Sequence, residues 1–311
     1  MEEGKIAFVF PGQGAQKVAM GHRLYELFPM SKGIMELASK VVGFDIAKLC
    51  FEGSLEDLSQ TENTQPALLT VSAMALEAFR SKASIKPDFV AGHSLGEFSA
   101  LYAAGALSFE DAVRIVRKRG QYMAQTKAGV MAAVLGLKSV AVEMICKEVS
   151  NVANWLQPAN YNGPTQTVVA GTKAALEMAI PLLKKMGAKK IIPLKVSGAF
   201  HTPILEPAAR KLSHDLDEIR AGKMEVPLVN NVDAKIISDL GEALEGLKRQ
   251  VVGAVRWTEV MEVLVKNGVR TVIEFGPGKT LGSMFKRMDK TLNVFNVEDD
   301  ESLNRTLEVL A

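Results

Sequence analysis

The stretch from Phe89 to Glu97, Phe-Val-Ala-Gly-His-Ser-Leu-Gly-Glu, constrains the fold more than any other part of the chain. An apolar run ends at Gly92, a serine follows two residues later, and an apolar helical pattern begins at once. A strand, tight turn and helix of this kind bring two backbones close together, and glycines at 92 and 96 remove side chains from that crossing. The Gly-x-Ser-x-Gly arrangement therefore predicts that Ser94 projects from a strained turn as a nucleophile. The alternative is a glycine-flanked turn with an idle serine.

Two backbone N–H groups are candidates for stabilising an oxyanion. Leu95 directly follows the serine, so we expect its N–H at the N-terminus of the next helix, where it can face developing negative charge. Gln13 lies in a Pro-Gly-Gln-Gly loop that ends a buried strand over residues 5–10, and it could supply a second N–H. The loop lacks the Lys-Ser/Thr of a P-loop and the third spaced glycine of a dinucleotide fingerprint.

Composition excludes several classes of protein. The chain has 311 residues, of which 48% are hydrophobic and 23% charged, the balance of a globular protein with a sizeable core. Its 37 basic and 35 acidic residues give a net charge of +2, too balanced for a nucleic-acid protein. The only cysteines, Cys50 and Cys146, are too few for a disulfide framework or a cysteine-built metal site.

The chain shows no targeting or membrane signal. It runs directly from its first residues into a strand without a signal segment, and no apolar run reaches membrane-spanning length. We therefore expect a cytoplasmic protein that binds neither nucleic acid nor membrane and holds no metal.

The order of predicted elements indicates two domains. Residues 1–128 and 196–311 alternate strands and helices, which predicts an α/β domain with a parallel sheet. Residues 129–195 follow the order strand, helix, strand, strand, helix, strand, which is that of a ferredoxin-like insert. Its second strand is predicted over 152–159, followed by an Asn-Tyr-Asn-Gly turn. Turn chemistry explains Asn160 and Asn162 in that turn, and contact with a ligand is the alternative.

Two further helices have clear start signals. Thr64-Gln65-Pro66 predicts the start of a long helix, with the proline in its first turn. A capping box at 108–111 predicts a helix over 109–124. At about 100° per residue, the apolar residues of the second helix fall within about 60° of Arg119. A guanidinium taken out of water needs an anionic partner. Arg119 therefore either forms a structural salt bridge with a core carboxylate or binds the carboxylate of a substrate.

His201 is the best candidate for a general base among the four histidines. It lies in a glycine-containing loop past a strand, just before a proline at a helix start, whereas His22 and His214 lie on polar helices and His93 adjoins the serine. From that position it could take the serine proton and return it to a leaving group. The alternative is a helix-capping loop residue.

No carboxylate is well placed to orient this histidine. A hydrolase of the usual chain order has an Asp or Glu between serine and histidine. Here the only aspartate in that interval is Asp111, which serves as a capping residue, although Glu97 and Glu110 are not excluded. A backbone carbonyl is then the expected partner of the imidazole, which points to a Ser–His dyad.

Together these motifs resemble the malonyl-CoA:acyl carrier protein transacylases, the discrete enzymes of bacterial type II fatty acid synthesis. The motifs span the chain in the family's order: Gly12-Gln13-Gly14-Ala15-Gln16, Gly92-His93-Ser94-Leu95-Gly96-Glu97, Arg119-Gly120, Ala199-Phe200-His201, Gln250 and Glu274-Phe275-Gly276-Pro277-Gly278. The resemblance implies a hydrolase-like α/β domain with an inserted ferredoxin-like domain. It also implies transfer of malonyl from malonyl-CoA to the pantetheine thiol of acyl carrier protein through a malonyl-serine, without a cofactor.

The resemblance also assigns roles to single residues. It implies that Ser94 is acylated, that His201 is the base, that the backbone N–H groups of Gln13 and Leu95 form the oxyanion hole, and that Arg119 holds the malonyl carboxylate. It implies a main-chain carbonyl near Gln250 as the partner of the histidine.

Three further residues complete the predicted site. Gln250, Phe200 and Asn162 are expected to contact substrate, and Phe200 resembles the malonyl-selecting form of the family. Ala15, where many members have serine, is a minor departure. We expect a monomer whose partners are malonyl-CoA and acyl carrier protein. A serine hydrolase and a non-catalytic docking subunit with a vestigial site are the competing hypotheses.

Overall fold

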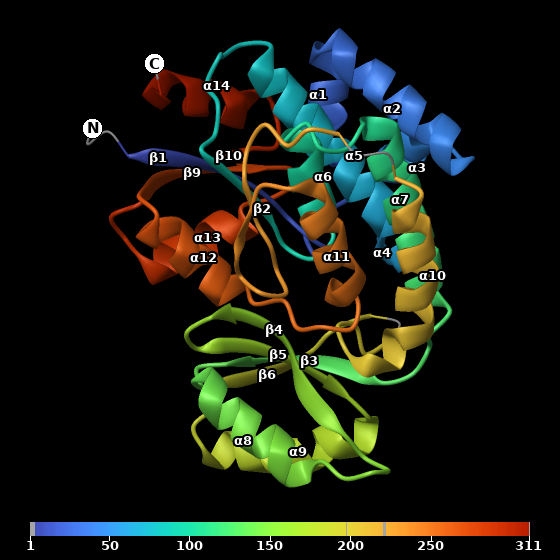
Figure 1. Cartoon of the computed structure of the whole chain (residues 1–311), viewed down its shortest axis with the longest axis vertical. Coiled ribbons are helices and arrows are strands. Elements are labelled where there is room, and N and C mark those ends of the chain that lie inside the picture. The colour runs from blue at the N-terminus through green and yellow to red at the C-terminus, as the bar shows by residue number, and fades with distance from the viewer. Residues whose placement is uncertain (1–3, 197, 220–221, 311) are drawn as a thin grey trace.

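The computed structural model describes residues 4–196, 198–219 and 222–310. In these ranges the larger sheet has the strand order β10-β9-β1-β2-β7-β8 (Figure 1). It is parallel except that its edge strand β8 runs antiparallel to β7, so the predicted parallel sheet is confirmed and the β8 edge was not foreseen. The strands are β1 Lys5–Phe10, β2 Phe89–Gly92, β7 Leu228–Val229, β8 Ile236–Ile237, β9 Val269–Phe275 and β10 Asn293–Val297.

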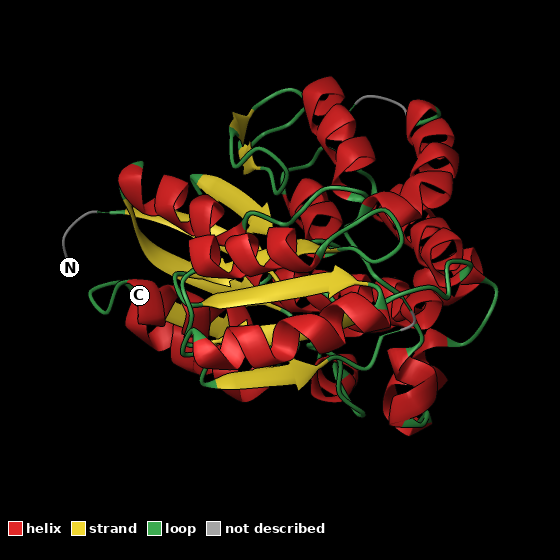
Figure 2. Ribbon diagram, turned by 90° about the horizontal axis from the view of Figure 1, so that it is seen from below, coloured by secondary structure: helices red, strands yellow, loops and turns green. Residues whose placement is uncertain are grey.

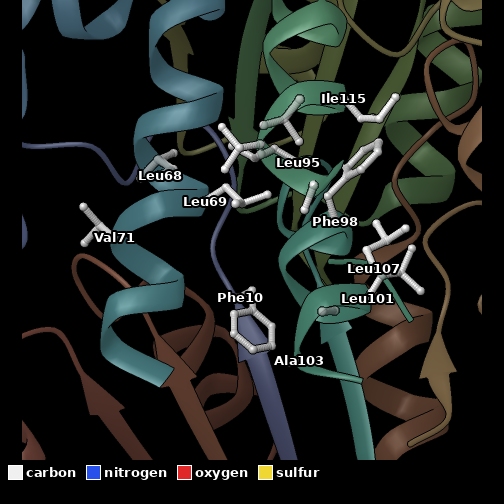
Figure 3. Packing of buried hydrophobic residues seen from close by; sticks show 14 of the residues in the cluster. Phe10, Leu68, Leu69, Val71, Leu95, Phe98, Leu101, Ala103, Leu107 and Ile115 are labelled. Carbon is white, nitrogen blue, oxygen red and sulfur yellow. The ribbon is translucent and has the colours of Figure 1, made fainter. Parts of the chain in front are cut away.

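Helices cover both faces of this sheet (Figures 1 and 2). They are α1 His22–Leu27, α2 Pro29–Val42, α3 Ile46–Glu52, α4 Leu55–Ser59, α5 Thr61–Arg80, α6 Gly96–Ala103, α7 Phe109–Ala124, the 3-10 turn Pro203–Leu205, α10 Glu206–Asp217, α11 Leu240–Gln250, α12 Trp257–Lys266, α13 Thr280–Met288 and α14 Asp300–Leu310. Successive side chains of β1 enter different apolar cores. Phe8 and Phe10 belong to the core formed with α5, α6 and α7, and Figure 3 shows Phe10 among residues of these helices. Ala7 and Val9 belong to the core formed with α12 and α13. Burial on both faces explains why β1 is apolar without interruption from Ile6 to Phe10.

The smaller sheet lies below the larger one in Figure 1. Its strands β3 Val130–Leu135, β4 Leu156–Gly163, β5 Gln166–Gly171 and β6 Lys190–Pro193 are antiparallel in the order β4-β5-β3-β6. Helices α8 Ser139–Val149 and α9 Lys173–Lys185 bury an apolar cluster against one face of it. The predicted order of strands and helices in the insert is confirmed. The domain boundaries at 128/129 and 195/196 stay a prediction.

The second strand of the insert begins and ends later than its sequence suggested. β4 runs to Gly163, so Asn160 and Asn162 lie in the strand, and the prediction of an Asn-Tyr-Asn-Gly turn is wrong. The backbone of β4 pairs with Val255 of the larger domain, whose N–H donates to Ala159 O at 2.9 Å and whose carbonyl accepts from Tyr161 N–H at 2.8 Å. This tertiary pairing overrides the turn preference of asparagine.

Helix α5 also differs from its predicted start. It begins at Thr61 rather than Thr64, so Pro66 lies inside the helix and not in its first turn. A proline there leaves the carbonyl of Glu62 without its helical N–H donor. Arg117 from α7 supplies the missing donor, with its Nη1 2.7 Å from that carbonyl oxygen. A contact from a distant helix thus stabilises a start that local sequence does not predict.

The turn after β2 is possible only because two glycines lie where backbones cross. A Cβ on Gly92 would lie 1.9 Å from the carbonyl of Gly96, and a Cβ on Gly96 would lie 2.1 Å from the carbonyl oxygen of Phe10. Both contacts are with backbone, which cannot move without shifting a strand or a helix. The close crossing predicted from the sequence is confirmed.

We expect Gly92→Ala to lower the free energy of unfolding by about 3 kcal/mol or more, because the added methyl group overlaps the backbone of Gly96. Gly33→Ala is the matched control, since Gly33 lies on helix α2 with open space around it and should gain up to about 1 kcal/mol in stability. Urea denaturation followed by circular dichroism measures both. Equal stabilities for the two variants would contradict the prediction.

Candidate active site

Ser94 occupies a strained turn between β2 and α6. Its φ of 52° is in the left-handed region, which costs a non-glycine residue about 1–2 kcal/mol. Asn231, just past β7, holds this turn from the neighbouring strand. Its Oδ1 accepts from the Ser94 N–H at 2.6 Å, and its Nδ2 donates to Gly92 O at 2.7 Å. Ser94 therefore lies on a strained turn, as predicted, and this turn is at the carboxyl end of β2.

His201 lies against the serine. Its Nε2 is 2.8 Å from Ser94 Oγ, and its Nδ1 is 2.9 Å from the main-chain oxygen of Gln250. A carbonyl oxygen only accepts, so the Nδ1 carries the proton and donates to it, which leaves the Nε2 free to accept from the serine hydroxyl. The backbone carbonyl expected in place of a carboxylate is present.

The surroundings of His201 keep its imidazole neutral. The side chain is buried, and this burial is the main cause that lowers its pKa to about 3; the positive charge of Arg119 lowers the pKa further. A neutral imidazole is the form that accepts a proton.

Arg119 reaches the serine from α7. Its Nη2 donates to Ser94 Oγ at 3.1 Å and to Gln250 Oε1 at 2.9 Å, and its Nη1 donates to Gln65 Oε1 at 2.8 Å. All three acceptors are neutral, and no carboxylate of the described residues forms a direct salt bridge with this guanidinium. The side chain is only 1% exposed, and burial lowers its pKa to about 10, an effect that the charge of Glu97 opposes. Arg119 is thus a buried cation at the nucleophile.

A cavity of about 80 Å³ lies over these groups. Apolar side chains form much of its wall together with the serine, the histidine and the arginine. It is lined by Gln13, His93, Ser94, Leu95, Arg119, Met123, Met131, Asn160, Leu194, Val196, Phe200 and His201. This volume is far below the about 300–1,000 Å³ of pockets that enclose whole drug-sized ligands, so only a small group fits inside.

The two predicted oxyanion donors both line this cavity. Gln13 follows β1 and Leu95 precedes α6, and within the described ranges neither backbone N–H has a hydrogen-bond partner. The side chain of Gln13 is held separately, because its Oε1 accepts from the Thr61 hydroxyl at 2.7 Å. Two free donors therefore remain beside the serine.

The other predicted substrate contacts have different positions. Phe200 and Asn160 line the cavity, whereas Asn162 lies beside it with its Oδ1 2.8 Å from His93 Nε2. Gln250 lies behind Arg119 and His201 and is itself 1% exposed. Direct contact of Asn162 and Gln250 with substrate stays a prediction.

Sequence reasoning gave no role to Asn231 or Gln65 and did not find the contact of a third residue of this site, Glu97. Asn231 follows a short strand, and its position at the carboxyl end of β7 was the only available signal. Gln65 is part of Thr64-Gln65-Pro66, which was interpreted only as the start of a helix. Glu97 was considered as a partner of the histidine, but the structure places its carboxylate on the Gln250 side chain, with Gln250 Nε2 donating to Glu97 Oε2 at 2.9 Å.

Neither a metal centre nor a membrane segment is found in the part of the chain that the structure describes. No cluster of three or more His, Cys, Asp or Glu side chains there is suited to hold a metal ion. No helix there is long and apolar enough to cross a membrane.

An α/β sheet with a serine on a strained strand-to-helix turn beside a neutral histidine defines the class of serine-dependent acyl-handling enzymes. The acyl transferase domain family matches residues 7–302. The malonyl CoA-acyl carrier protein transacylase of Bacillus subtilis is 43% identical over 309 residues, covering 98% of this chain and 97% of that protein. The chain therefore belongs to the acyl transferase family and, within it, to the malonyl CoA-acyl carrier protein transacylases.

Solved structures agree with this assignment. An acyl carrier protein S-malonyltransferase from Vibrio cholerae is 40% identical with a TM-score of 0.93, covering 97% of this chain and 99% of that one. A malonyl-transacylase in complex with its type II PKS acyl-carrier protein is 39% identical with a TM-score of 0.94, covering 98% of this chain and 99% of that one. The family resemblance and the fold class predicted from sequence are confirmed.

We expect the His201 imidazole of the ligand-free enzyme to stay neutral through about pH 5 to 8, where free histidine titrates, because its pKa is lowered to about 3 from 6.5. Since the unfolded chain binds this proton more tightly, the stability that His201 contributes is present above pH 6.5 and is lost as the pH falls toward 3. NMR of ring-labelled histidine measures the titration, with His201→Gln to assign the signal and N-acetylhistidine as an internal reference. A midpoint near that of the reference would contradict the prediction.

Proposed function

We propose that this chain transfers malonyl from malonyl-CoA to the pantetheine thiol of acyl carrier protein, through an ester on Ser94, and so supplies fatty acid elongation. The observation that carries the proposal is the buried guanidinium of Arg119, whose Nη2 lies 3.1 Å from the serine Oγ. An arginine binds a carboxylate through two parallel charge-assisted hydrogen bonds. Malonyl differs from acetyl by such a carboxylate.

In the first half-reaction, Ser94 Oγ attacks the thioester carbonyl of malonyl-CoA. His201 Nε2, at 2.8 Å, takes the hydroxyl proton as the bond forms. The backbone N–H groups of Gln13 and Leu95 stabilise the oxyanion of the tetrahedral intermediate. The intermediate collapses by breaking the carbon–sulfur bond, and the coenzyme A sulfur leaves with the proton from His201. Malonyl then remains as an ester on Ser94.

In the second half-reaction, the pantetheine thiol of acyl carrier protein takes the place of coenzyme A. His201 accepts the thiol proton, and the sulfur attacks the ester carbonyl. When the carbon–oxygen bond breaks, Ser94 Oγ regains its proton from His201. No redox step is involved, and the residues of the chain supply every proton transfer without a cofactor.

The size and polarity of the cavity support a short acid-bearing acyl group. A cavity of about 80 Å³ admits the malonyl group and leaves the rest of the thioester outside. Phe200 lines the cavity together with the histidine that follows it, which supports its proposed role in selecting malonyl. Asn162 and Gln250 complete the proposed set of substrate contacts.

A monomeric state and a cytoplasmic location stay predictions.

Ser94→Ala should abolish acylation, because the nucleophilic oxygen is removed while the fold loses only one hydroxyl. Intact-protein mass spectrometry after brief exposure to malonyl-CoA measures the adduct. In the unsubstituted enzyme, we expect an adduct on Ser94 that acyl carrier protein discharges and water removes only slowly. Rapid hydrolysis of the adduct would instead indicate an esterase. The absence of any adduct would indicate a docking subunit with a vestigial site.

Arg119→Ala should slow malonyl transfer by roughly 30- to several-thousand-fold, the equivalent of the about 2–5 kcal/mol lost when one partner of a buried charge pair is truncated. Acetyl transfer should fall much less, or rise, because an apolar acyl group gains nothing from the cation. Single-turnover acylation of Ser94 by malonyl-CoA and acetyl-CoA in parallel measures both.

Arg114→Ala is the matched control for this substitution, since Arg114 lies on the same helix but pairs with Asp111 at the surface. Arg119→Lys should rescue malonyl transfer only in part, because a point charge does not reproduce the planar fork. Equal losses for malonyl and acetyl in Arg119→Ala would make Arg119 a structural residue and contradict its substrate role.

A further inference from the structure

Glu97 is a buried carboxylate that the reaction above does not use. It lies in the first turn of α6 and is 1% exposed. Its Oε2 accepts two hydrogen bonds, from the Asn231 backbone N–H at 3.0 Å and from Gln250 Nε2 at 2.9 Å, whereas its Oε1 has no partner among the described residues. Burial raises its pKa to about 7, and the two donors and Arg119 oppose that rise. Burying a carboxylate is unfavourable without a compensating positive charge.

The compensating positive charge is Arg119, which the side-chain amide of Gln250 separates from Glu97. Gln250 Oε1 accepts from Arg119 Nη2 at 2.9 Å, and Gln250 Nε2 donates to Glu97 Oε2 at 2.9 Å. The amide dipole is therefore aligned between a cation and an anion, which strengthens both hydrogen bonds. The other charges that act on Glu97 are Asp233 and Arg249, and these two form a salt bridge with each other at 2.6 Å.

We infer that Glu97 is the standing counter-ion of Arg119, acting through the Gln250 amide, and that it limits how tightly the site holds the carboxylate of its substrate. This inference rests on the proposed function, in which Arg119 binds malonyl. Because the Gln250 amide separates Glu97 from Arg119, Glu97 compensates the charge of the guanidinium when no substrate is bound. It does so without accepting hydrogen bonds from the guanidinium N–H groups that face Ser94. When malonyl binds, its carboxylate and that of Glu97 both interact with Arg119. Each carboxylate then weakens the attraction between Arg119 and the other.

A limited ground-state affinity for the malonyl group is an advantage for a transferase. Binding that is equally strong in the ground state and in the transition state does not speed the chemical step. A fully uncompensated arginine would bind the malonyl ester tightly before the carrier thiol attacks. Glu97 lowers that ground-state affinity while leaving Arg119 charged.

Glu97→Gln separates the charge of this residue from its hydrogen bonds. An amide oxygen in the place of Oε2 can accept from both Asn231 and Gln250, and the amide nitrogen then takes the place of the unpartnered Oε1. Glu274→Gln is the matched control. Glu274 is a buried carboxylate on β9 whose pKa burial also raises to about 7, but it accepts from the backbone N–H groups of Leu281 and Gly282, away from Arg119.

The test is single-turnover acylation of Ser94 at pH 8, where most Glu97 carboxylates are ionised, over a range of malonyl-CoA and acetyl-CoA concentrations. In Glu97→Gln, we expect the half-saturating concentration of malonyl-CoA to fall on the order of tenfold, because a like charge near the substrate is removed. The value for acetyl-CoA should stay the same. Glu274→Gln should leave the ratio of the two values unchanged.

Two results would overturn the inference. An unchanged ratio in Glu97→Gln would mean that the charge of Glu97 does not reach the substrate. A higher half-saturating concentration for malonyl-CoA alone would mean that Glu97 only holds Arg119 in position. Failure of the proposed function is distinguishable from both, because the unsubstituted enzyme would then show no malonyl adduct, or Arg119→Ala would slow malonyl and acetyl equally.

A second measurement does not depend on the folding of Glu97→Gln. Ser94→Ala, which binds without turnover, is titrated with each acyl-CoA by calorimetry in buffers of different ionisation enthalpy at pH 7. Malonyl-CoA should cause more proton uptake than acetyl-CoA, because its carboxylate raises the proton affinity of Glu97. The coenzyme A phosphates are common to both ligands, and the pKa of His201 in the ligand-free protein, about 3, lies far below the pH of the experiment. Equal proton uptake would overturn the inference.

Discussion

The close crossing of three backbone segments beside Ser94 is the constraint on which the rest of the site depends. β1, β2 and the start of α6 approach so closely that a Cβ on either flanking glycine would overlap main-chain atoms. Because the carbonyl of Phe10 lies against Gly96, the loop after β1 is brought beside the serine, and with it Gln13. The crossing therefore fixes the nucleophile and places both proposed oxyanion donors on one cavity.

Gln250 connects the groups around this crossing. Its main-chain oxygen takes the Nδ1–H of His201, and its side chain lies between Arg119 and Glu97 while also donating to Ser94 O at 3.0 Å. One residue at the end of α11 therefore orients the base, the cation and its anion. This arrangement explains how a buried arginine can stay charged beside a neutral histidine without a direct salt bridge.

The insert closes the site from the other side. Its strand β4 pairs with Val255, and Asn162 of the same strand contacts His93 beside the nucleophile. Met131, Asn160 and Leu194 of this region also line the cavity. Residues from both parts of the fold therefore line the cavity.

The sequence by itself determined most of the elements and most of the chemical groups. Glycine spacing marked Ser94, helical periodicity placed Arg119 in a buried stripe, and the lack of a suitable acid pointed to a backbone partner for His201. These signals are local, since capping, periodicity and tight turns depend on neighbours within a few residues.

Only the tertiary structure decided what those groups touch. Ser94 is held by Asn231, 137 positions away, and Glu97 meets Gln250 across 153 positions. Long-range contacts also explain the errors in the predicted elements. Strand β4 extends further because it pairs with Val255. Helix α5 begins earlier because Arg117 donates the hydrogen bond that Pro66 cannot. Hydrogen bonds between residues so far apart leave no periodic trace in the chain, so a single sequence cannot show them.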